Sequence, residues 1–381
     1  MRLLLKPFQL GPYELSHRVV MAPLTRLRAS SDGIVHPLAA VYYGQRASSG
    51  GLLITEATSA AANGNGYLGA PGIYDDSQVA PWREIVRAVH AKGGRIFMQL
   101  YHAGRRSHAD VQPDRVRPVG PSEVVHGSQA LTAAGWVPNT PNRALRLDEI
   151  PAIVEQFRLA ATRALTAGFD GVELHGANGY LFDQFMQDNS NLRRDSYGGS
   201  IANRARLLLE TAQAVSTVAG SARVGVRLSP SGRVGDMADS DPPALFSHVA
   251  ASLAQLDLAY LHLIEPRMQG TALDTAAGAV QQPVAAAMLR PHYSGTLIVA
   301  GGFEPAGAEA ILQSGDADLV AFGRHFIANP DLPARIRHGW PLAAHDRATF
   351  YGGGAAGYTD YPVWPSSVEN QGVVKKLEIK D

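Results

Sequence analysis

The sequence of 381 residues contains no cysteine, and this absence excludes several kinds of chemistry at once. Disulfides, thiolate zinc sites, iron–sulfur clusters and a thiol nucleophile all depend on cysteine. Lysine is also absent over a long part of the chain, between Lys92 and Lys375. That part contains strands three to eight of the fold predicted below. An aldolase or another enzyme that forms a Schiff base on a strand-end lysine is therefore disfavoured.

Charge of one sign and long apolar runs are lacking as well. The 34 basic and 34 acidic residues give a formal net charge of zero, and no basic tract indicates nucleic-acid binding. The apolar run within residues 1–7 is too short for a signal peptide, and no stretch approaches the length of a membrane span. We therefore expect a cytoplasmic protein that binds neither nucleic acid nor membrane.

Eight short apolar runs recur along the chain, each followed by a loop and an amphipathic segment. Such runs are typical of parallel strands that are covered on both faces. Eight strand–helix units predict the α/β class and a (β/α)8 TIM barrel, as a single domain over residues 1–381. The predicted strands are Val19–Thr25, Gly51–Ser59, Arg95–His102, Gly171–Ala177, Arg223–Pro230, Ala259–Pro266, Thr296–Gly302 and Leu319–Phe326.

The clearest helical pattern covers residues 148–167, where apolar side chains recur on one face. Asp148 is the expected N-cap and Gly168 the C-terminal stop. A doubly wound sheet is the alternative architecture, and it needs a glycine-rich phosphate loop after the first strand. The residues at that place are Arg26–Arg28, so the barrel is favoured.

Two segments interrupt the barrel pattern. Residues 1–18, with the turn-prone Gly11-Pro12, predict an N-terminal hairpin that caps the barrel floor. Residues 103–147, after strand three, are rich in proline and have little periodicity. An insertion at this loop lies over the catalytic mouth as a lid or pocket wall, or is a surface excursion without a role. Residues 365–381 are expected to be a C-terminal tail.

Polar residues stand at the carboxyl ends of the predicted strands, where the active sites of such barrels lie. Gln99 and Arg227 are embedded in apolar strands, and a polar ligand in the barrel mouth would give both a partner. After strand four come two hydrogen-bond donors, His175 and Asn178, and a phenol, Tyr180. This set suits the binding of a substrate oxygen and the delivery of a proton, although a strand-end histidine also has a structural alternative.

Glycines follow strands seven and eight. Gly301 and Gly302 end strand seven, and Gly323 precedes Arg324 in strand eight. Backbone N–H groups at such glycines approach an anion closely, and the arginine adds a cation, so we predict a phosphate site. Glycines that serve only tight turns are the alternative.

Two further patterns resemble ligand sites but do not have the neighbouring elements or residues that such sites require. Residues 352–357 fit the G-x-G-x-x-G pattern, but no convincing strand precedes them and no helix follows. We interpret them as a loop that presents Tyr351. His102 and His108 have no third histidine or carboxylate at useful spacing, so we expect no metal.

Taken in order, several motifs resemble those of the Old Yellow Enzyme family of FMN-dependent ene-reductases. The resemblance covers about residue 5 to about residue 365. Its C-terminal part is similar to the bacterial N-ethylmaleimide and pentaerythritol tetranitrate reductases. Thr25 stands where the thermophilic-like branch carries a cysteine. The motifs are Ala22–Arg26, Gln99–His102, His175–Leu181, Arg193–Ser200, Gly301-Gly302, Phe322–Arg324, Phe350–Gly353 and Gly357–Pro362.

The resemblance implies a role for each matching position. The residues that it implies for FMN binding are Pro23, Leu24, Thr25, Ala57, Gln99, Arg227, Gly301, Gly302, Gly323 and Arg324. The residues that it implies for substrate binding are His175, Asn178, Tyr67, Tyr101 and Tyr351. Tyr180 would be the proton donor, so the implied catalytic set is Tyr180, His175 and Asn178.

The implied activity is the reduction of activated C=C bonds in α,β-unsaturated carbonyl compounds, maleimides and nitroalkenes, with nitrate esters as a further class. NADPH, or NADH, would supply the hydride through FMN, and Tyr180 would protonate the product. The implied partner is a small molecule with an activated alkene, and the protein would be a monomer or a homodimer. Another phosphate-binding barrel enzyme, such as an isomerase, and a flavin-binding protein without turnover are the alternatives.

Overall fold

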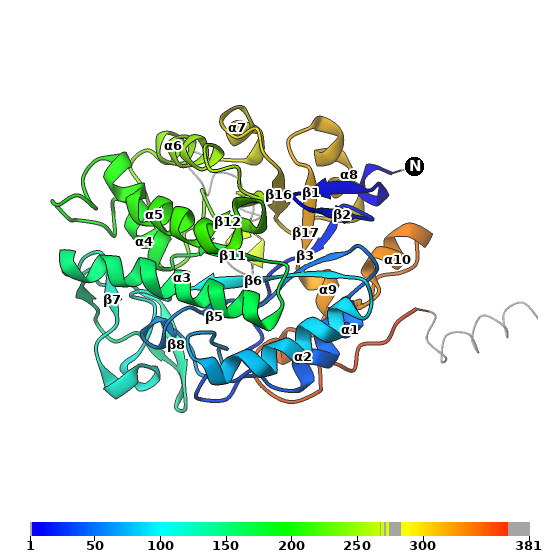
Figure 1. Ribbon diagram of the computed structural model, residues 1–381, viewed down its shortest axis with the longest axis horizontal. Helices are drawn as coiled ribbons and strands as arrows, with labels where there is room; N and C mark the ends of the chain where they lie inside the picture. Colours follow the sequence, from blue (N-terminus) through cyan, green and yellow to red (C-terminus); the bar gives the residue numbers. More distant parts are fainter. Residues whose placement is uncertain (1, 267, 270–271, 274–282, 365–381) are drawn as a thin grey trace, which may run out of the picture.

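Eight parallel strands close into a barrel in the computed structural model, which describes residues 2–266, 268–269, 272–273 and 283–364 (Figure 1). Each strand pairs in parallel with its neighbours, and β6 pairs with β11 to complete the ring. The predicted TIM barrel is therefore confirmed. Its strands are β3 (Val19–Met21), β4 (Leu52–Ile54), β6 (Arg95–Tyr101), β11 (Gly171–Gly176), β12 (Val224–Leu228), β13 (Tyr260–Ile264), β16 (Leu297–Ala300) and β17 (Leu319–Phe322).

Along several strands, successive residues fall in two different apolar clusters, as the pleat of a strand requires. Val20 and Leu52 belong to an inner cluster, whereas Val19 and Leu53 belong to an outer one that includes the helices. The N-terminal strands β1 (Phe8–Leu10) and β2 (Tyr13–Leu15) pair antiparallel, and residues of both join the inner cluster. The predicted hairpin therefore caps one end of the barrel.

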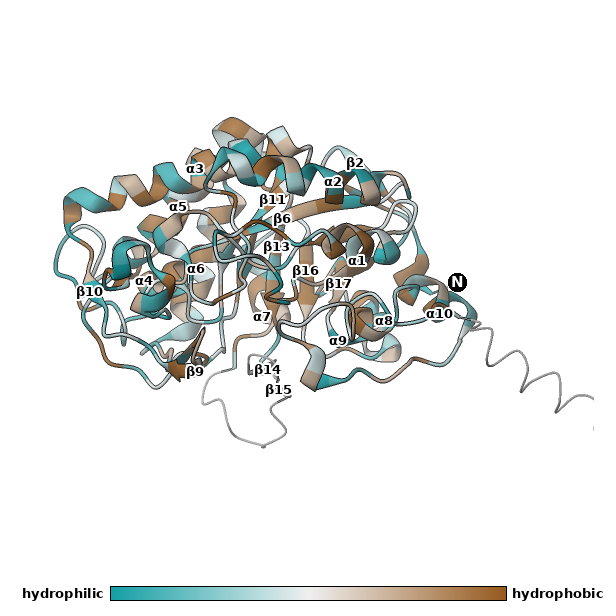
Figure 2. Ribbon diagram, turned by 90° about the horizontal axis from the view of Figure 1, so that it is seen from below, coloured by the Kyte–Doolittle hydropathy of each residue, from teal (hydrophilic) through white to brown (hydrophobic). Residues whose placement is uncertain are grey.

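Helices lie around the outside of the strands, and α3 carries both polar and apolar residues along its length (Figures 1 and 2). This pattern places an apolar face on the barrel and a polar face toward solvent. The helices are α1 (Leu38–Arg46), α2 (Val79–His90), α3 (Ile150–Ala167), α4 (Leu181–Met186), α5 (Ile201–Ala219), α6 (Pro242–Ala254), α7 (Ala286–Leu289), α8 (Pro305–Ser314), α9 (Arg324–Ala328) and α10 (Leu332–His338). No helix of the described residues is long and apolar enough to cross a membrane.

The predicted start of α3 is wrong in detail. Asp148 is not its N-cap, because residues 147–149 form a 3₁₀ turn and Glu149 precedes the helix. Glu149 accepts a hydrogen bond from the Arg146 backbone N–H at 2.7 Å, which closes a cap one turn earlier than expected. Gly168 does end the helix, with a φ of 98° that favours glycine.

The first and last strands are also shorter than predicted. β3 ends at Met21, and the chain from residue 22 leaves the sheet. β17 ends at Phe322, and α9 begins two residues later at Arg324. In both places the residues that follow the strand, 22–25 and 323–324, line the cavity described below.

The insertion contains four short strands. β8 (Gln129–Thr132) and β9 (Gly135–Pro138) form an antiparallel hairpin, and β7 (Val119–Gly120) pairs in parallel with β10 (Arg143–Ala144). Three other short strands are β5 (Thr58–Ser59), which pairs with β6, and the pair β14 (Met268–Gln269) and β15 (Ala272–Leu273). The predicted tail, residues 365–381, lies outside the described residues.

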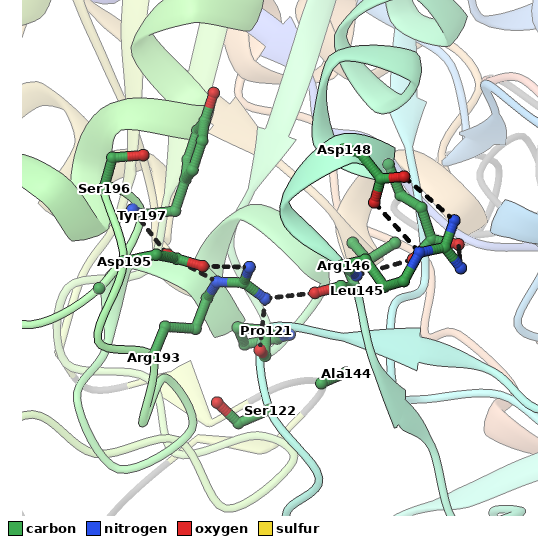
Figure 3. A network of polar contacts seen from close by, with 12 residues as sticks. Pro121, Ser122, Ala144, Leu145, Arg146, Asp148, Arg193, Asp195, Ser196 and Tyr197 are labelled. Carbon is green, nitrogen blue, oxygen red and sulfur yellow. Dashed lines mark hydrogen bonds and ion pairs between the residues drawn. The ribbon is translucent and has the colours of Figure 1, made fainter.

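Arg193 holds the two sides of the insertion together (Figure 3). Its Nη1 donates to the carbonyl oxygens of Pro121 (3.0 Å), after β7, and Leu145 (2.5 Å), after β10. Its guanidinium also pairs with the Asp195 carboxylate at 2.5 Å. The motif that begins at Arg193 therefore anchors the insertion to the barrel.

Candidate active site

A cavity of about 480 Å³ lies where the carboxyl ends of the barrel strands meet. This position and size suit a small-molecule site of a barrel enzyme. Most of the residues predicted for cofactor and substrate line it. They are Pro23, Leu24, Thr25, Tyr67, Asn178, Tyr180, Arg227, Gly301, Gly302, Gly323, Arg324 and Tyr351.

The turn after β11 presents Asn178 and Tyr180 to this cavity. Asn178 and Gly179 both have positive φ, 58° and 71°. The Asn178 N–H donates to Ser229 Oγ (2.8 Å), and the Gly179 N–H donates to Asp183 Oδ2 (2.8 Å). A Cβ on Gly179 would lie 2.2 Å from the Val234 carbonyl oxygen, so glycine is required here.

His175 is a neutral hydrogen-bond donor. Its Nδ1 accepts from the Ala177 backbone N–H (3.3 Å), which leaves the ring proton on Nε2. Burial, reinforced by the positive charge of Arg227, holds the pKa of His175 well below its ordinary value. Its ring packs edge-on against Tyr180, with centroids 4.9 Å apart. His175 lies just behind the residues that line the cavity.

Tyr180 is the buried phenol of the site. Its hydroxyl donates to the Tyr67 hydroxyl at 3.3 Å, and its ring lies 5.2 Å from that of Tyr101. The Arg106 guanidinium lies 5.0 Å from the centre of the same ring. Burial, and then the neighbouring Tyr67, raise the pKa of Tyr180 well above its usual value, so the phenol keeps its proton at neutral pH.

Arg227 is a buried cation in the wall of the cavity. Its Nε atom is inaccessible to solvent and has no hydrogen-bond partner within the described part of the chain. Burial lowers the pKa of its guanidinium from the usual value, which Glu173 opposes. An unpaired buried cation is costly, so a bound group with negative or polar edges fits this position. The isoalloxazine pyrimidine edge of FMN is such a group.

The residues predicted to bind phosphate surround one part of the cavity. Gly302 has a φ of 63°, and a Cβ on Gly323 would lie 3.2 Å from Leu24 Cδ2. Both positions therefore bring bare backbone to the cavity wall, and Arg324 adds a cation. This cradle suits the phosphate of FMN.

Gln99 has a different environment from the predicted one. Its Nε2 donates to Glu173 Oε1 at 2.6 Å, directly across the β6–β11 pair, and it does not line the cavity. Glu173 also accepts from His262 Nδ1 at 2.9 Å, and this contact, with Gln99 and Arg227 nearby, holds the pKa of Glu173 below its usual value despite burial. The amide nitrogen of Gln99 is therefore satisfied without a ligand. Its contact with FMN stays a prediction.

Ala57 and Tyr101 also lie behind the cavity wall. They belong to a small apolar cluster with Tyr67 and Tyr180, and Tyr101 is 1% exposed. Both can shape the cavity through these neighbours, but neither lines it in the described residues.

The sequence analysis did not single out Trp136, which joins the predicted wall residues Tyr67 and Tyr351 in an aromatic wall. Trp136 of β9 lies edge-on to Tyr67 (6.0 Å) and to Tyr351 (6.1 Å). The insertion therefore contributes a residue to the cavity. The isolated tryptophan within 103–147 was the available signal. Arg106 also lines the cavity and was missed.

The second glycine run is a loop, as predicted. No helix or strand forms between residues 350 and 364. Arg26 Nη2 donates to the Gly357 carbonyl (2.7 Å), and Arg28 Nε donates to the Gly354 carbonyl (3.1 Å). These bonds hold the loop so that Tyr351 lines the cavity.

Comparisons with known proteins agree with this geometry. Residues 3–343 match the profile of the NADH:flavin oxidoreductase / NADH oxidase family. The chain is 45% identical over 373 residues to putative 12-oxophytodienoate reductase 3 of Oryza sativa subsp. japonica, across 97% of this chain and 95% of the relative. It is 44% identical over 361 residues to 12-oxophytodienoate reductase 2 of Arabidopsis thaliana, across 94% and 95%.

Two solved structures are similar over nearly the whole chain. Morphinone reductase has a TM-score of 0.88 at 46% identity, across 95% of this chain and 96% of its own. The Old Yellow Enzyme homologue of Zymomonas mobilis has a TM-score of 0.90 at 42% identity, across 94% and 99%. One morphinone reductase structure is a complex with tetrahydroNAD.

Proposed function

Because the chain belongs to the NADH:flavin oxidoreductase / NADH oxidase family, as an Old Yellow Enzyme-type ene-reductase, we propose how its cavity performs the reaction of that family. The reaction is the FMN-dependent reduction of activated C=C bonds by NAD(P)H. One observation carries the proposal: the buried phenol of Tyr180 and the unpaired guanidinium of Arg227 share one cavity.

Arg227 and the two glycine segments would hold the cofactor. When bound, FMN would supply the hydride-transfer chemistry that links the nicotinamide to the activated alkene. The Arg227 guanidinium would stabilise negative charge on the cofactor ring, and Gly301, Gly302, Gly323 and Arg324 would hold the phosphate. The residues proposed to line the ring are Pro23, Leu24, Thr25, Ala57 and Gln99.

His175 and Asn178 would bind the substrate oxygen. His175 Nε2–H and the Asn178 amide donate to the carbonyl or nitro group, and they stabilise the negative charge that develops there as the double bond is reduced. The neutral state of His175 makes it a donor without adding a cation beside Arg227.

Tyr180 would then deliver a proton to the α-carbon. Its pKa, raised by burial, keeps the hydroxyl protonated until negative charge develops on the substrate. Tyr67 and Tyr101 position its ring, and Tyr351 with Trp136 closes the side wall of the cavity.

We propose a cytoplasmic protein of one domain, either a monomer or a homodimer, that binds neither nucleic acid nor membrane. The zero net charge supports the absence of a nucleic-acid partner. Enones, maleimides, nitroalkenes and nitrate esters are the proposed substrates, and NADPH or NADH is the proposed reductant.

An anaerobic visible spectrum tests the function. The purified protein should show a flavin band that NADPH bleaches and that 2-cyclohexenone restores. A band that bleaches and does not return would mean that the substrate class is wrong. Absence of a flavin band after addition of FMN would overturn the cofactor assignment.

A further inference from the structure

Arg106 brings a third guanidinium to the cavity, beside Arg227 and Arg324. The proposed function gives the other two to FMN, but it gives no role to Arg106. No aspartate or glutamate stands among the described residues that line this cavity. The part of the cavity near Arg106 is therefore positively charged.

The contacts of Arg106 leave part of its guanidinium free. Its Nη1 donates to the Asn178 carbonyl oxygen at 2.6 Å, and its Nε is buried with no hydrogen-bond partner in the described chain. Two other buried arginines have a carboxylate partner. Arg193 pairs with Asp195, and Arg204 pairs with Asp239.

The carboxylate whose charge acts on Arg106, Asp183, is already engaged in other hydrogen bonds. Asp183 accepts from the Gly179 N–H at 2.8 Å and from Gln187 Nε2 at 2.6 Å. Burial alone would lower the pKa of Arg106, and the nearby Tyr67, Tyr180 and Asp183 reverse that effect, so the group stays charged. A buried cation in this setting favours an external anion.

We propose that Arg106 selects for a substrate that carries a carboxylate, so that the preferred substrate is an anionic activated alkene. The proposal rests on the function proposed above. The contacts of Arg106 place the anion beside Asn178 and Tyr180, the residues assigned to the substrate. The phosphates of the reductant are therefore the less favoured source.

A matched pair of probes tests the proposal. Maleimidoacetate and its methyl ester share one reacting ring and differ by one charge. The measured quantity is the acid-to-ester ratio, which is kcat/KM for maleimidoacetate divided by kcat/KM for its methyl ester. We expect R106Q to lower this ratio by about ten- to a hundredfold, because the variant loses a charge-assisted hydrogen bond to the acid. R106K should retain more of the ratio than R106Q. R158Q, an arginine on α3 that pairs with Glu155 outside the cavity, should leave the ratio unchanged.

A binding measurement on the unaltered protein needs no variant. Titration of the oxidised holoenzyme with succinimidoacetate and with its methyl ester, followed by the flavin spectrum, gives two dissociation constants. The acid should bind at least about tenfold more tightly than the ester at low salt. Equal binding, or tighter binding of the ester, would overturn the proposal whether or not R106Q folds.

Each other result for R106Q assigns a different role to Arg106. An unchanged acid-to-ester ratio in R106Q would overturn the proposal, and an equal loss for both probes would assign Arg106 to the positioning of Tyr180. A weaker affinity for NADPH with an unchanged ratio would assign it to the reductant. If the holoenzyme reduces neither probe, the proposed function itself fails. If it reduces the ester and the ratio does not respond, this inference alone fails.

Discussion

The Tyr180 hydroxyl donates a hydrogen bond to the Tyr67 hydroxyl across 3.3 Å, at the side of a cavity that Arg227 also lines. The two tyrosines come from different loops, 113 residues apart in the sequence. This bond aims the Tyr180 hydroxyl along the cavity wall, and burial keeps it protonated.

Replacement of Tyr180 by Phe should slow enone reduction by about a hundredfold or more, because a general acid contributes about that much. NADPH oxidation by the flavin should continue, since it does not use this proton. Stopped-flow measurement of the two half-reactions separates the effects. Tyr13→Phe removes a hydroxyl at the other end of the barrel, where it donates to the Asp170 carbonyl, and should change neither rate. Equal enone turnover in Tyr180→Phe and the unaltered protein would refute the proton-donor role.

Replacement of Arg227 by Met should lower the midpoint potential of bound FMN. The guanidinium is buried and unpaired within the described residues, so in the proposed site it would stabilise negative charge on the reduced flavin. Arg227→Lys keeps the charge and should recover part of the shift. Spectroelectrochemical titration of the three holoproteins measures the effect. A potential that stays constant across the three would show that Arg227 does not face the flavin.

Replacement of Gly179 by Ala should abolish most enone turnover and destabilise the fold. The added Cβ would lie 2.2 Å from the Val234 carbonyl oxygen, so the turn that carries Asn178 must move. Gly199→Ala is a matched control: its φ of 77° gives similar backbone strain, but nothing lies within 4 Å of its Cβ. Gly199→Ala should therefore cost about 1 kcal/mol of stability and little activity. Similar losses in both variants would contradict the steric argument.

Asp183 makes the stability of the protein depend on pH. Burial raises the pKa of its carboxyl from 3.8 to about 6 in the folded protein. Between pH 3.8 and pH 6 the carboxyl group ionises in the unfolded chain but stays protonated in the folded protein. The free energy of unfolding is therefore highest below pH 3.8 and falls as the pH rises toward 6. At neutral pH the loss reaches about 3 kcal/mol.

Comparison of Asp183→Asn with the unaltered holoprotein isolates this group. The unfolding free energy of the variant, relative to the unaltered protein, should rise by about 2 kcal/mol between pH 4 and pH 6. Urea unfolding of both proteins at several pH values measures the difference. A difference that is constant with pH would mean that Asp183 titrates at its ordinary value.

The resemblance to the Old Yellow Enzyme family, inferred from ordered motifs, is confirmed by the family match and the solved structures. The closer likeness to N-ethylmaleimide and pentaerythritol tetranitrate reductases stays a prediction, as does the tail at 365–381. The roles of the site residues also stay predictions, although most of those residues do line one cavity.

The sequence by itself determined the barrel and the positions of its strand-end residues. Parallel strands covered on both faces are continuous apolar runs, and the carboxyl ends of such strands must meet at one mouth. Pro23, Asn178, Arg227 and Gly302 could therefore be placed around one site before any contact was known. This inference needs only the repeat of apolar runs and amphipathic segments along the chain and the parallel direction of the strands.

Only the tertiary structure decided which distant residues touch. Gln99 meets Glu173 because β6 and β11 are neighbours in a particular register when the barrel closes. Trp136 reaches Tyr67 and Tyr351 because the path of the insertion brings its β8–β9 hairpin beside residue 68, whose N–H donates to the Leu131 carbonyl oxygen. Long-range contacts of this kind depend on register, loop path and side-chain packing. No local pattern of residues encodes those three features.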